Sequence, residues 1–384
     1  MRKSLLVVTA AIPLAAALAI PAFAGSADTV EVTRTSGEKV AGQYIVTLKG
    51  DAEMGAAATA ADVGAKPLHT YKTALKGFAA KLSRAQLESL QGNPQVAAIE
   101  EDGVVHADTT QTDEPWGLDR IDQRQLPLSS SYHYTHQGKG VKAYVIDTGI
   151  QAGHPTFGTR AKSVFDATGG TGRDCNGHGT HVAGTIGGKR WGVAKLAQLR
   201  GVRVLDCNGS GTFSGVIAGV DWVTRNHVKP AVANMSLGGS ESASVDNAVT
   251  AMTQAGVFTA VAAGNSNANA CLSSPSGAAN VTSVAASDKT DTKASFSNHG
   301  SCVDVYAPGV DVRSAWLNGT TNTISGTSMA SPHVAGAAAI YKQLHPGASS
   351  ATVNNWIIDA STKGVIKGSP TGTVQRLLFK GPAL

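Results

Sequence analysis

The sequence has few aromatic and charged side chains and, after residue 24, no long apolar run. Aromatic residues make up 5% and charged residues 15% of its 384 residues, while glycines number 44. This composition indicates a compact, closely packed protein rather than a coiled or disordered chain. The formal net charge is +5, but the lysines and arginines are scattered singly, which argues against a nucleic-acid partner. The lack of a later apolar run argues against a membrane anchor.

The first 24 residues have the features of an export signal. Arg2 and Lys3 precede an apolar run over residues 5–20, and residues 22–24 offer an A-x-A cleavage site. A membrane anchor is the alternative interpretation of this run. The cleavage site favours a signal peptide, so we expect a secreted, extracellular protein.

The four cysteines then become informative, because an exported chain meets an oxidising compartment. They are Cys175, Cys207, Cys271 and Cys302. Four cysteines permit three pairings, and pairing in sequence order would close two loops of similar length, each stabilising the fold by roughly 3–4 kcal/mol. A zinc site using Cys175 with His178 and His181 is the alternative, but the sequence offers no matching second pair of ligands.

Residues 25–42 are expected to be a polar spacer, and residues 43–108 a small α+β unit. The predicted elements are strands at 43–48 and 78–82, helices at 52–63 and 83–90, and closing strands at 96–99 and 104–105. Ser83 and Gln86 form the capping box of the second helix. This arrangement predicts a ferredoxin-like strand–helix–strand–strand–helix–strand fold. Taken alone, such a unit would fit an ordinary interaction domain.

Residues 109–384 are expected to form one α/β domain. Short apolar strands are predicted at 141–146, 202–205, 231–237 and 257–262, separated by helical segments. This alternation of strands and helices is typical of a mostly parallel sheet with helices on both faces. Ligands bind such sheets outside the carboxyl ends of the strands. Asp147, Ser236 and Asn265 all follow predicted strands, so we expect the functional side chains to lie together at one edge of the sheet.

The most specific segment of the chain surrounds Ser328, within residues 325–336. Pro332 follows four residues later, and proline is tolerated in a helix only within the first turn. The helix is therefore expected to begin close to Ser328. That places the hydroxyl at the positive end of a helix, which suits a nucleophile whose reaction forms an oxyanion.

A serine nucleophile needs a base and a third group that orients the base. His178 lies between two glycines at a predicted helix start, and Asp147 ends a predicted strand. Alone, the histidine would more often be a packing residue and the aspartate a turn residue, but the three motifs together favour catalysis. Asn265, just past another strand, is the expected side-chain donor to an oxyanion.

Two other classes of hydrolase match parts of this pattern. Aspartic proteases share the Asp-Thr-Gly motif at residues 147–149 but need two carboxylates, and no second such motif occurs. The α/β-hydrolases place the acid and then the histidine after the serine. Here Asp359 is the acid candidate, yet the last histidine is His345. The order aspartate, histidine, serine is instead that of subtilisin.

Three segments, at residues 145–149, 176–184 and 326–333, are similar to the three signatures of subtilisin-like serine proteases. The chain from residue 116 to 379 resembles the proteinase K branch, and most of all the secreted bacterial aqualysin group. The resemblance implies an endopeptidase acting on flexible protein and peptide substrates. It also implies a self-processing zymogen in which the propeptide at residues 43–107 inhibits the enzyme until it is cut away. We expect a monomer.

The resemblance also assigns roles to residues. Ser328 would attack the scissile carbonyl, His178 would transfer the proton, and Asp147 would hold His178. Asn265 and the Ser328 backbone N–H would stabilise the oxyanion. The implied substrate cleft has a small, apolar lining and hence a broad preference for apolar or aromatic side chains, and it is formed by Gly209, Ser210, Gly211, Ser236, Leu237, Gly238, Ala262, Ala263 and Gly264.

The same resemblance implies the disulfides Cys175–Cys207 and Cys271–Cys302. An inactive binding protein with this fold remains the non-enzyme alternative. All four catalytic positions carry the expected residue types, and this argues against it.

No cofactor for catalysis is implied, but structural calcium is. Asp304, with the backbone carbonyls of Ala279 and Val281, aligns with a calcium site of the proteinase K branch, and oxygen ligands suit this ion. Three further residues resemble part of a second site, although Ser129 stands where related chains carry an acid. These three are Asp119, Asp122 and Gln123.

Overall fold

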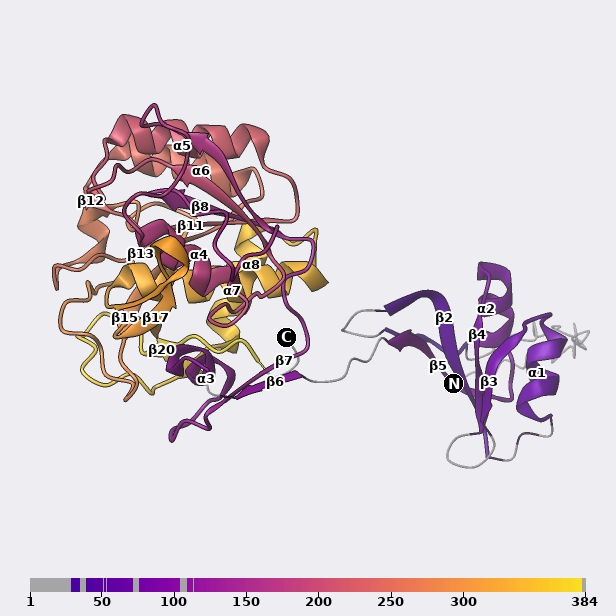
Figure 1. Ribbon diagram of the computed structural model, residues 1–384. Helices are drawn as coiled ribbons and strands as arrows, with labels where there is room; N and C mark the ends of the chain where they lie inside the picture. The colour runs from indigo at the N-terminus through magenta and orange to yellow at the C-terminus, as the bar shows by residue number, and fades with distance from the viewer. Residues whose placement is uncertain are drawn as a thin grey trace, which may run out of the picture. The chain divides into compact units, whose positions relative to one another are not determined.

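The computed structural model describes residues 29–34, 39–50, 52, 54–71, 76–103, 109–112 and 114–381. The chain divides into two compact units, Met1–Val105 and His106–Leu384 (Figure 1). The predicted signal peptide, the strand at 104–105 and the junction within residues 107–110 lie wholly or partly outside the described residues. Among the described helices, none combines the length and the apolar character that a membrane span requires.

The N-terminal unit is a five-stranded sheet with two helices, and its strand order is β1-β5-β2-β4-β3. From β2 onward its elements follow the expected ferredoxin-like succession. They are β1 (Val32–Thr33), β2 (Lys39–Leu48), α1 (Ala56–Asp62), β3 (Pro67–Tyr71), β4 (Gly77–Lys81), α2 (Arg84–Gln91) and β5 (Val96–Gly103). The predicted capping box is confirmed, because Ser83 and Gln86 exchange side-chain to backbone hydrogen bonds at the start of α2.

One prediction for this unit is wrong in part, and one strand was not predicted. The predicted spacer over 25–42 contributes to the sheet, since β1 pairs with β5 and β2 begins at Lys39. Residues 67–71 form an edge strand, β3, that the sequence did not reveal. All its side chains are exposed or half-buried, so they carry no apolar alternation.

The larger unit is organised by a nine-stranded sheet with the order β19-β20-β16-β15-β13-β11-β8-β10-β9. All its strand pairs are parallel except β19–β20, which confirms the expected sheet. Its strands are β8 (Lys142–Asp147), β9 (Ala161–Asp166), β10 (Gln198–Arg203), β11 (Ala231–Met235), β13 (Phe258–Ala262), β15 (Thr282–Ser287), β16 (Val305–Pro308), β19 (Thr362–Lys363) and β20 (Arg376–Leu377). Three short antiparallel pairs surround it: β6 (Thr109–Thr112) with β7 (Ser131–Tyr134), β12 (Gly239–Ser240) with β14 (Ser273–Ser274), and β17 (Val312–Ala315) with β18 (Thr321–Ile324).

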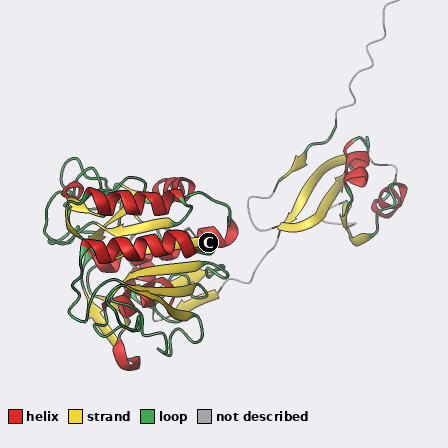
Figure 2. Ribbon diagram, turned by 90° about the horizontal axis from the view of Figure 1, so that it is seen from above, coloured by secondary structure: helices red, strands yellow, loops and turns green. Residues whose placement is uncertain are grey.

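Helices cover both faces of this sheet (Figures 1 and 2). They are α3 (Trp116–Asp122), α4 (His178–Gly187), α5 (Phe213–Asn226), α6 (Ala243–Gln254), α7 (Thr327–Leu344) and α8 (Ser350–Ala360). Alternate residues of β8 point to opposite faces, as strand geometry requires. Ile146 packs in the core beneath α5 and α6, whereas Val145 packs in the core with α4, α7 and α8. Burial on both faces explains the nearly continuous apolar character of the central strands.

Both disulfides implied by the resemblance are present. The sulfur atoms of Cys175 and Cys207 are 2.04 Å apart, and those of Cys271 and Cys302 are 2.10 Å apart. The zinc alternative at Cys175 is therefore wrong, because that thiol is in a disulfide. The described residues contain no cluster of three or more His, Cys, Asp or Glu side chains able to hold a metal ion.

Candidate active site

Ser328 lies in the first turn of α7, as the sequence predicted, but the role of Pro332 differs from the expectation. The helix begins at Thr327, which puts Pro332 in its second turn. Proline has no N–H to donate to the carbonyl four residues earlier, which is that of Ser328. The hydroxyl of Ser236 donates to this carbonyl instead, with an O–O distance of 2.7 Å. The proline is thus compatible with the helix because another strand supplies the missing donor.

The Ser328 hydroxyl donates in turn to the backbone carbonyl of Ser236, at 3.3 Å. Ser236 directly follows β11, and its hydroxyl accepts a hydrogen bond from Asn234 Nδ2 at 2.9 Å. Asn234 Oδ1 accepts from Ser331 Oγ in α7, at 2.7 Å. This exchange of hydrogen bonds fixes the start of α7 on the carboxyl end of β11.

Asp147 and His178 are already paired. Asp147 ends β8 with no exposed surface, and His178 is the first residue of α4. His178 Nδ1 lies 2.7 Å from Asp147 Oδ1, which also accepts the backbone N–H of Thr148 at 2.7 Å. The other carboxylate oxygen, Oδ2, is buried and has no hydrogen-bond partner among the described residues.

Two opposing effects set the basicity of His178. Burial lowers the pKa of His178, whereas the charge and hydrogen bond of Asp147, together with the charge of Asp174, raise it. The net result is a raised pKa. The imidazole is therefore a stronger base than a free histidine and is held with Nδ1 toward the carboxylate.

Asn265 is oriented by the residue that precedes the serine. Its Oδ1 accepts both the backbone N–H and the hydroxyl of Thr327, at 2.8 and 2.9 Å. Because the carbonyl oxygen is engaged in this way, the amide nitrogen is left as the group available to a ligand. A methyl group built on Gly326 would lie 3.6 Å from that nitrogen, so the amide faces the start of α7.

Two adjoining cavities, of about 580 and 310 Å³, lie beside these groups and share residues 237–239. The larger is lined by His178 and by the predicted residues Gly209, Ser210, Gly211 and Ser236. The smaller is lined by Asn265 and Ser328 and by the predicted residues Ala262, Ala263 and Gly264. The structure thus brings all nine predicted cleft residues to one continuous groove.

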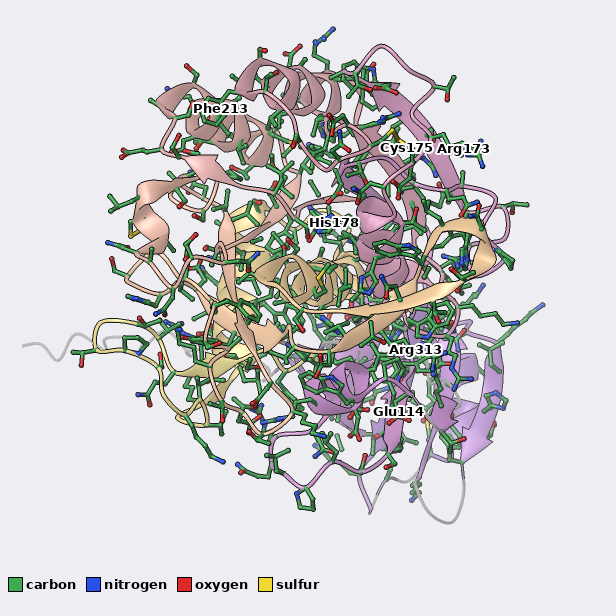
Figure 3. The ribbon with its side chains drawn as sticks, turned by 60° about the vertical axis from the view of Figure 1, so that its left-hand side comes forward. Glu114, Arg173, Cys175, His178, Phe213 and Arg313 are labelled. Atoms are coloured by element: carbon green, nitrogen blue, oxygen red, sulfur yellow. A yellow bond between two sulfur atoms is a disulfide. The ribbon has the colours of Figure 1, made fainter. Side chains whose placement is uncertain are left out.

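Sequence reasoning missed several apolar residues of the larger cavity. They are Leu205, Phe213, Val216 and Val245. Phe213, labelled with His178 in Figure 3, begins α5 and is 43% exposed. A large apolar side chain that remains exposed beside a cavity indicates a binding residue, but this exposure is visible only in the structure and not in the sequence.

The residues expected to hold calcium fit that ion in part. Val281 and Asp304 directly precede the neighbouring parallel strands β15 and β16. One carboxylate oxygen of Asp304 accepts the N–H of Ser283 at 2.8 Å. Burial raises the pKa of Asp304 to about 6, although the Ser283 N–H and the charge of Arg376 act in the opposite direction. A half-buried carboxylate whose pKa is raised in this way is suited to a bound cation.

The second candidate calcium site is occupied by hydrogen bonds within the chain. Asp119 Oδ1 accepts the N–H and hydroxyl of Ser129, at 3.1 and 3.0 Å, and Asp119 Oδ2 accepts the N–H of Ser130 at 2.7 Å. Gln123 Oε1 also accepts from Ser129 N, and Asp122 Oδ2 from His133 N. The serine at position 129 therefore supplies donors where a metal site needs acceptors.

The fold and these groups define a class of protein. A nucleophile at a helix start, an aspartate–histidine pair and an amide beside the groove lie at the carboxyl edge of a parallel sheet. The subtilase family model matches residues 138–376, and the peptidase inhibitor I9 model matches residues 43–108. The chain belongs to the subtilase family.

Individual relatives agree with this assignment. An extracellular serine proteinase of Thermus sp. (strain Rt41A) is 51% identical over 320 residues, covering 82% of this chain and 78% of the relative. A cuticle-degrading protease of Metarhizium anisopliae is 44% identical and covers 96% of this chain and 97% of the relative. The crystal structure of a cold adapted subtilisin-like serine proteinase matches with a TM-score of 0.69 and 49% identity, covering 70% of this chain and 99% of that chain. The expectation of a secreted subtilisin-like serine endopeptidase made as a zymogen is confirmed.

Proposed function

We propose that Ser328, His178 and Asp147 are the catalytic residues of this endopeptidase. The observation that carries the proposal is the 2.7 Å bond between Asp147 and His178 Nδ1, because it leaves Nε2 as the proton acceptor. The Ser328 hydroxyl donates a long hydrogen bond of 3.3 Å to the backbone carbonyl of Ser236. Rotation about its Cα–Cβ bond would turn the hydroxyl toward Nε2 when substrate binds, and such bonds often tighten only then.

In the reaction, Ser328 Oγ attacks the scissile carbonyl carbon as its proton passes to His178 Nε2. His178 then donates this proton to the leaving amine, and a water repeats the sequence to release the acyl group. Asp147 stabilises the imidazolium that forms during both acylation and deacylation. Its unpartnered oxygen Oδ2 leaves the carboxylate charge poorly solvated, and this strengthens that stabilisation.

The oxyanion is stabilised by the side-chain amide of Asn265 and the backbone N–H of Ser328. Both donors are fixed before substrate arrives, the first by Thr327 and the second by its place in the first turn of α7. Preorganised neutral donors of this kind supply much of the rate enhancement in acyl transfer. The positive end of α7 adds a favourable potential.

The two cavities would bind the substrate on the acyl side of the scissile bond. Residues 262–264 line the smaller cavity next to Ser328, so it would accept the side chain before that bond. Residues 209–211 are exposed at the rim of the larger cavity, and the substrate would pair with this segment as an added strand. Because neither cavity is lined by an acidic residue, we propose a broad preference for apolar or aromatic side chains.

The remaining proposals concern the whole protein. Residues 1–24 would be removed on export, residues 43–108 would inhibit the groove until cut away within 107–110, and the mature enzyme would be a monomer without a membrane anchor. Asp304, Ala279 and Val281 would hold one structural calcium ion. Bound there, the ion would neutralise a half-buried carboxylate and take no part in the reaction.

The test of this function is the intact mass of the secreted product for the wild type and for Ser328→Ala. We expect the wild type to lose its residues up to about 108 and the variant to keep them. Peptide hydrolysis by the variant should fall about 10⁶-fold, as it does in subtilisin, a member of the same family. If both products are trimmed alike and the variant still cuts peptides at the normal rate, Ser328 is not the nucleophile.

A further inference from the structure

A second buried carboxylate, Asp174, lies beside the catalytic pair and has no role in the mechanism above. It is 2% exposed and lies between Arg173 and Cys175, which are labelled with His178 in Figure 3. Its two oxygens accept five hydrogen bonds, all from neutral donors. A buried charge with this many backbone and hydroxyl donors is held in one position and fixes its donors in return.

One of those donors connects Asp174 to the catalytic aspartate. Thr148 Oγ1 donates to Asp174 Oδ1 at 2.9 Å, and the backbone N–H of Thr148 donates to Asp147 Oδ1 at 2.7 Å. Thr148 has no exposed surface. The same residue therefore bonds one carboxylate with its side chain and the other with its backbone.

The other donors connect Asp174 to the catalytic histidine. Asp174 Oδ2 accepts the N–H and the hydroxyl of Thr180, at 2.9 and 2.6 Å, in the first turn of α4. The N–H of Gly179 donates to Thr148 Oγ1 at 2.9 Å. The N–H groups of a first turn lack partners within the helix, and here those of Gly179 and Thr180 bond to Thr148 and Asp174. His178 begins this turn, so its backbone is fixed relative to the carboxylate it must contact.

We propose that Asp174 is a positioning residue for peptide hydrolysis, holding Asp147 and His178 in alignment through Thr148 and the first turn of α4. The inference rests on the proposed function, because it needs His178 to be the base. The negative charge of Asp174 also favours the protonated imidazole that forms during attack. The positive end of the α4 dipole disfavours a positive charge on His178, and the Asp174 carboxylate, bonded to the first turn of α4, offsets this effect.

The test uses Asp174→Asn, which keeps the shape but places an NH₂ group opposite the N–H of Thr180. Mature enzyme is titrated with a fluorophosphonate, and rates are expressed per mole of labelled serine so that any misfolded fraction drops out. We expect kcat to fall about 10²-fold, the cost of a misplaced catalytic group, with KM little changed. The acid limb of the kcat/KM profile should also move to lower pH, though less than in a variant of Asp147, because one of the two carboxylate charges that raise the pKa of His178 is gone.

An unchanged kcat or an unmoved acid limb would overturn the proposal, whatever happens to the melting temperature. The proposed function would still stand if Ser328→Ala were inactive, and it would fail separately if that variant were active. The matched control is Asp288→Asn. That carboxylate also accepts the N–H and hydroxyl of one threonine, Thr290, but in a loop outside both cavities, so its kcat and acid limb should be those of the wild type.

A second pair of variants keeps the test open if Asp174→Asn does not mature. Thr148→Val removes the hydroxyl that joins Asp174 to Gly179, whereas Thr148→Ser retains it. We expect a loss of kcat in the valine variant and its recovery in the serine variant. Equal kcat values in the two variants would contradict the inferred connection.

Discussion

The catalytic groove has two halves that are built from different chemistry. The base half, at the end of β8 and the start of α4, holds two buried carboxylates: Asp147 bonds the imidazole, and Asp174 bonds the first turn of α4. In the nucleophile half, at β11, β13 and the start of α7, the described residues that line the smaller cavity are all neutral, among them Asn265 and Thr327. Charge is placed where a proton is to be accepted, and fixed dipoles are placed where an oxyanion is to form. The two halves should therefore respond differently to mutation and to pH.

The halves also differ in how completely they are assembled before substrate binds. The carboxylate–imidazole bond measures 2.7 Å, whereas the serine hydroxyl makes a 3.3 Å bond to a backbone carbonyl. The base half is already in its working geometry. In the nucleophile half, the Ser328 hydroxyl must still rotate about its Cα–Cβ bond, while the oxyanion donors around it are fixed.

The largest effect among the tests of this comparison is expected in the base half, from Asp147→Asn. The amide cannot stabilise the imidazolium and favours the wrong tautomer, so kcat should fall about 10⁴-fold. Since Asp147 raises the pKa of His178, the acid limb of kcat/KM should also move to lower pH. In the wild type that limb should lie above about 6.5, the value of a free histidine. A pH profile of the purified mature variant checks both effects, and an unmoved limb would count against Asp147 as the partner.

The next effect belongs to the nucleophile half. Asn265→Ala removes one oxyanion donor and should lower kcat about 10²–10³-fold, as the equivalent loss does in subtilisin. Because no charge changes, the acid limb should stay in place, in contrast to Asp147→Asn. The control is Asn226→Ala, in which the lost amide bonds only to its own helix α5. A normal kcat in the Asn265 variant would remove Asn265 from the site.

A smaller effect on kcat is expected from Thr327, which orients the oxyanion donor Asn265 but does not itself bind the oxyanion. Thr327→Val deletes the hydroxyl that donates to Asn265 Oδ1 but keeps the backbone N–H that does the same. Asn265 Oδ1 then loses one of its two neutral bonds, and the N–H of Gly264 loses its acceptor, so kcat should fall about three- to tenfold. Thr327→Ser should restore it. Steady-state kinetics on the pair decide the matter, and equal losses in both variants would indicate a packing effect of the methyl group.

The smallest effect on catalysis, and a distinct one on stability, is expected from calcium removal. Burial raises the pKa of Asp304 to about 6, so in the ion-free fold this group's stabilising contribution is complete below pH 4 and is lost as pH rises through 6. Calcium at about 100 times its Kd should raise the melting temperature by about 5–10 °C at pH 8 and by little at pH 4. Calorimetry with and without a chelator measures this. In Asp304→Asn the difference between the two pH values should vanish.

The main features of the site could be predicted from the sequence because each motif has a local cause. Asp147, Ser236 and Asn265 follow apolar strands, and parallel strands bring their carboxyl ends to one edge. The position of Pro332 predicted a helix start close to Ser328, and α7 begins at Thr327, although the proline lies in the second turn rather than the first. Local patterns of this kind are visible without knowledge of tertiary structure.

The features that the sequence did not reveal depend on partners distant in the chain. The donor to the Ser328 carbonyl, Ser236, is 92 residues away, and the residue that orients Asn265 is 62 residues away. Asp174 is separated by 26 residues from Thr148 and had no motif of its own. Edge strand β3 lacked any apolar alternation. None of these contacts follows from periodicity or from turn chemistry.

The most direct test of the account is covalent labelling of the mature enzyme with a serine-directed fluorophosphonate, followed by peptide mapping. The account predicts one labelled residue, Ser328, with a labelling rate that rises with pH as His178 loses its proton and that is strongly reduced in Asp147→Asn. Labelling at another serine, or a rate at Ser328 that is indifferent to both pH and Asp147, would contradict it.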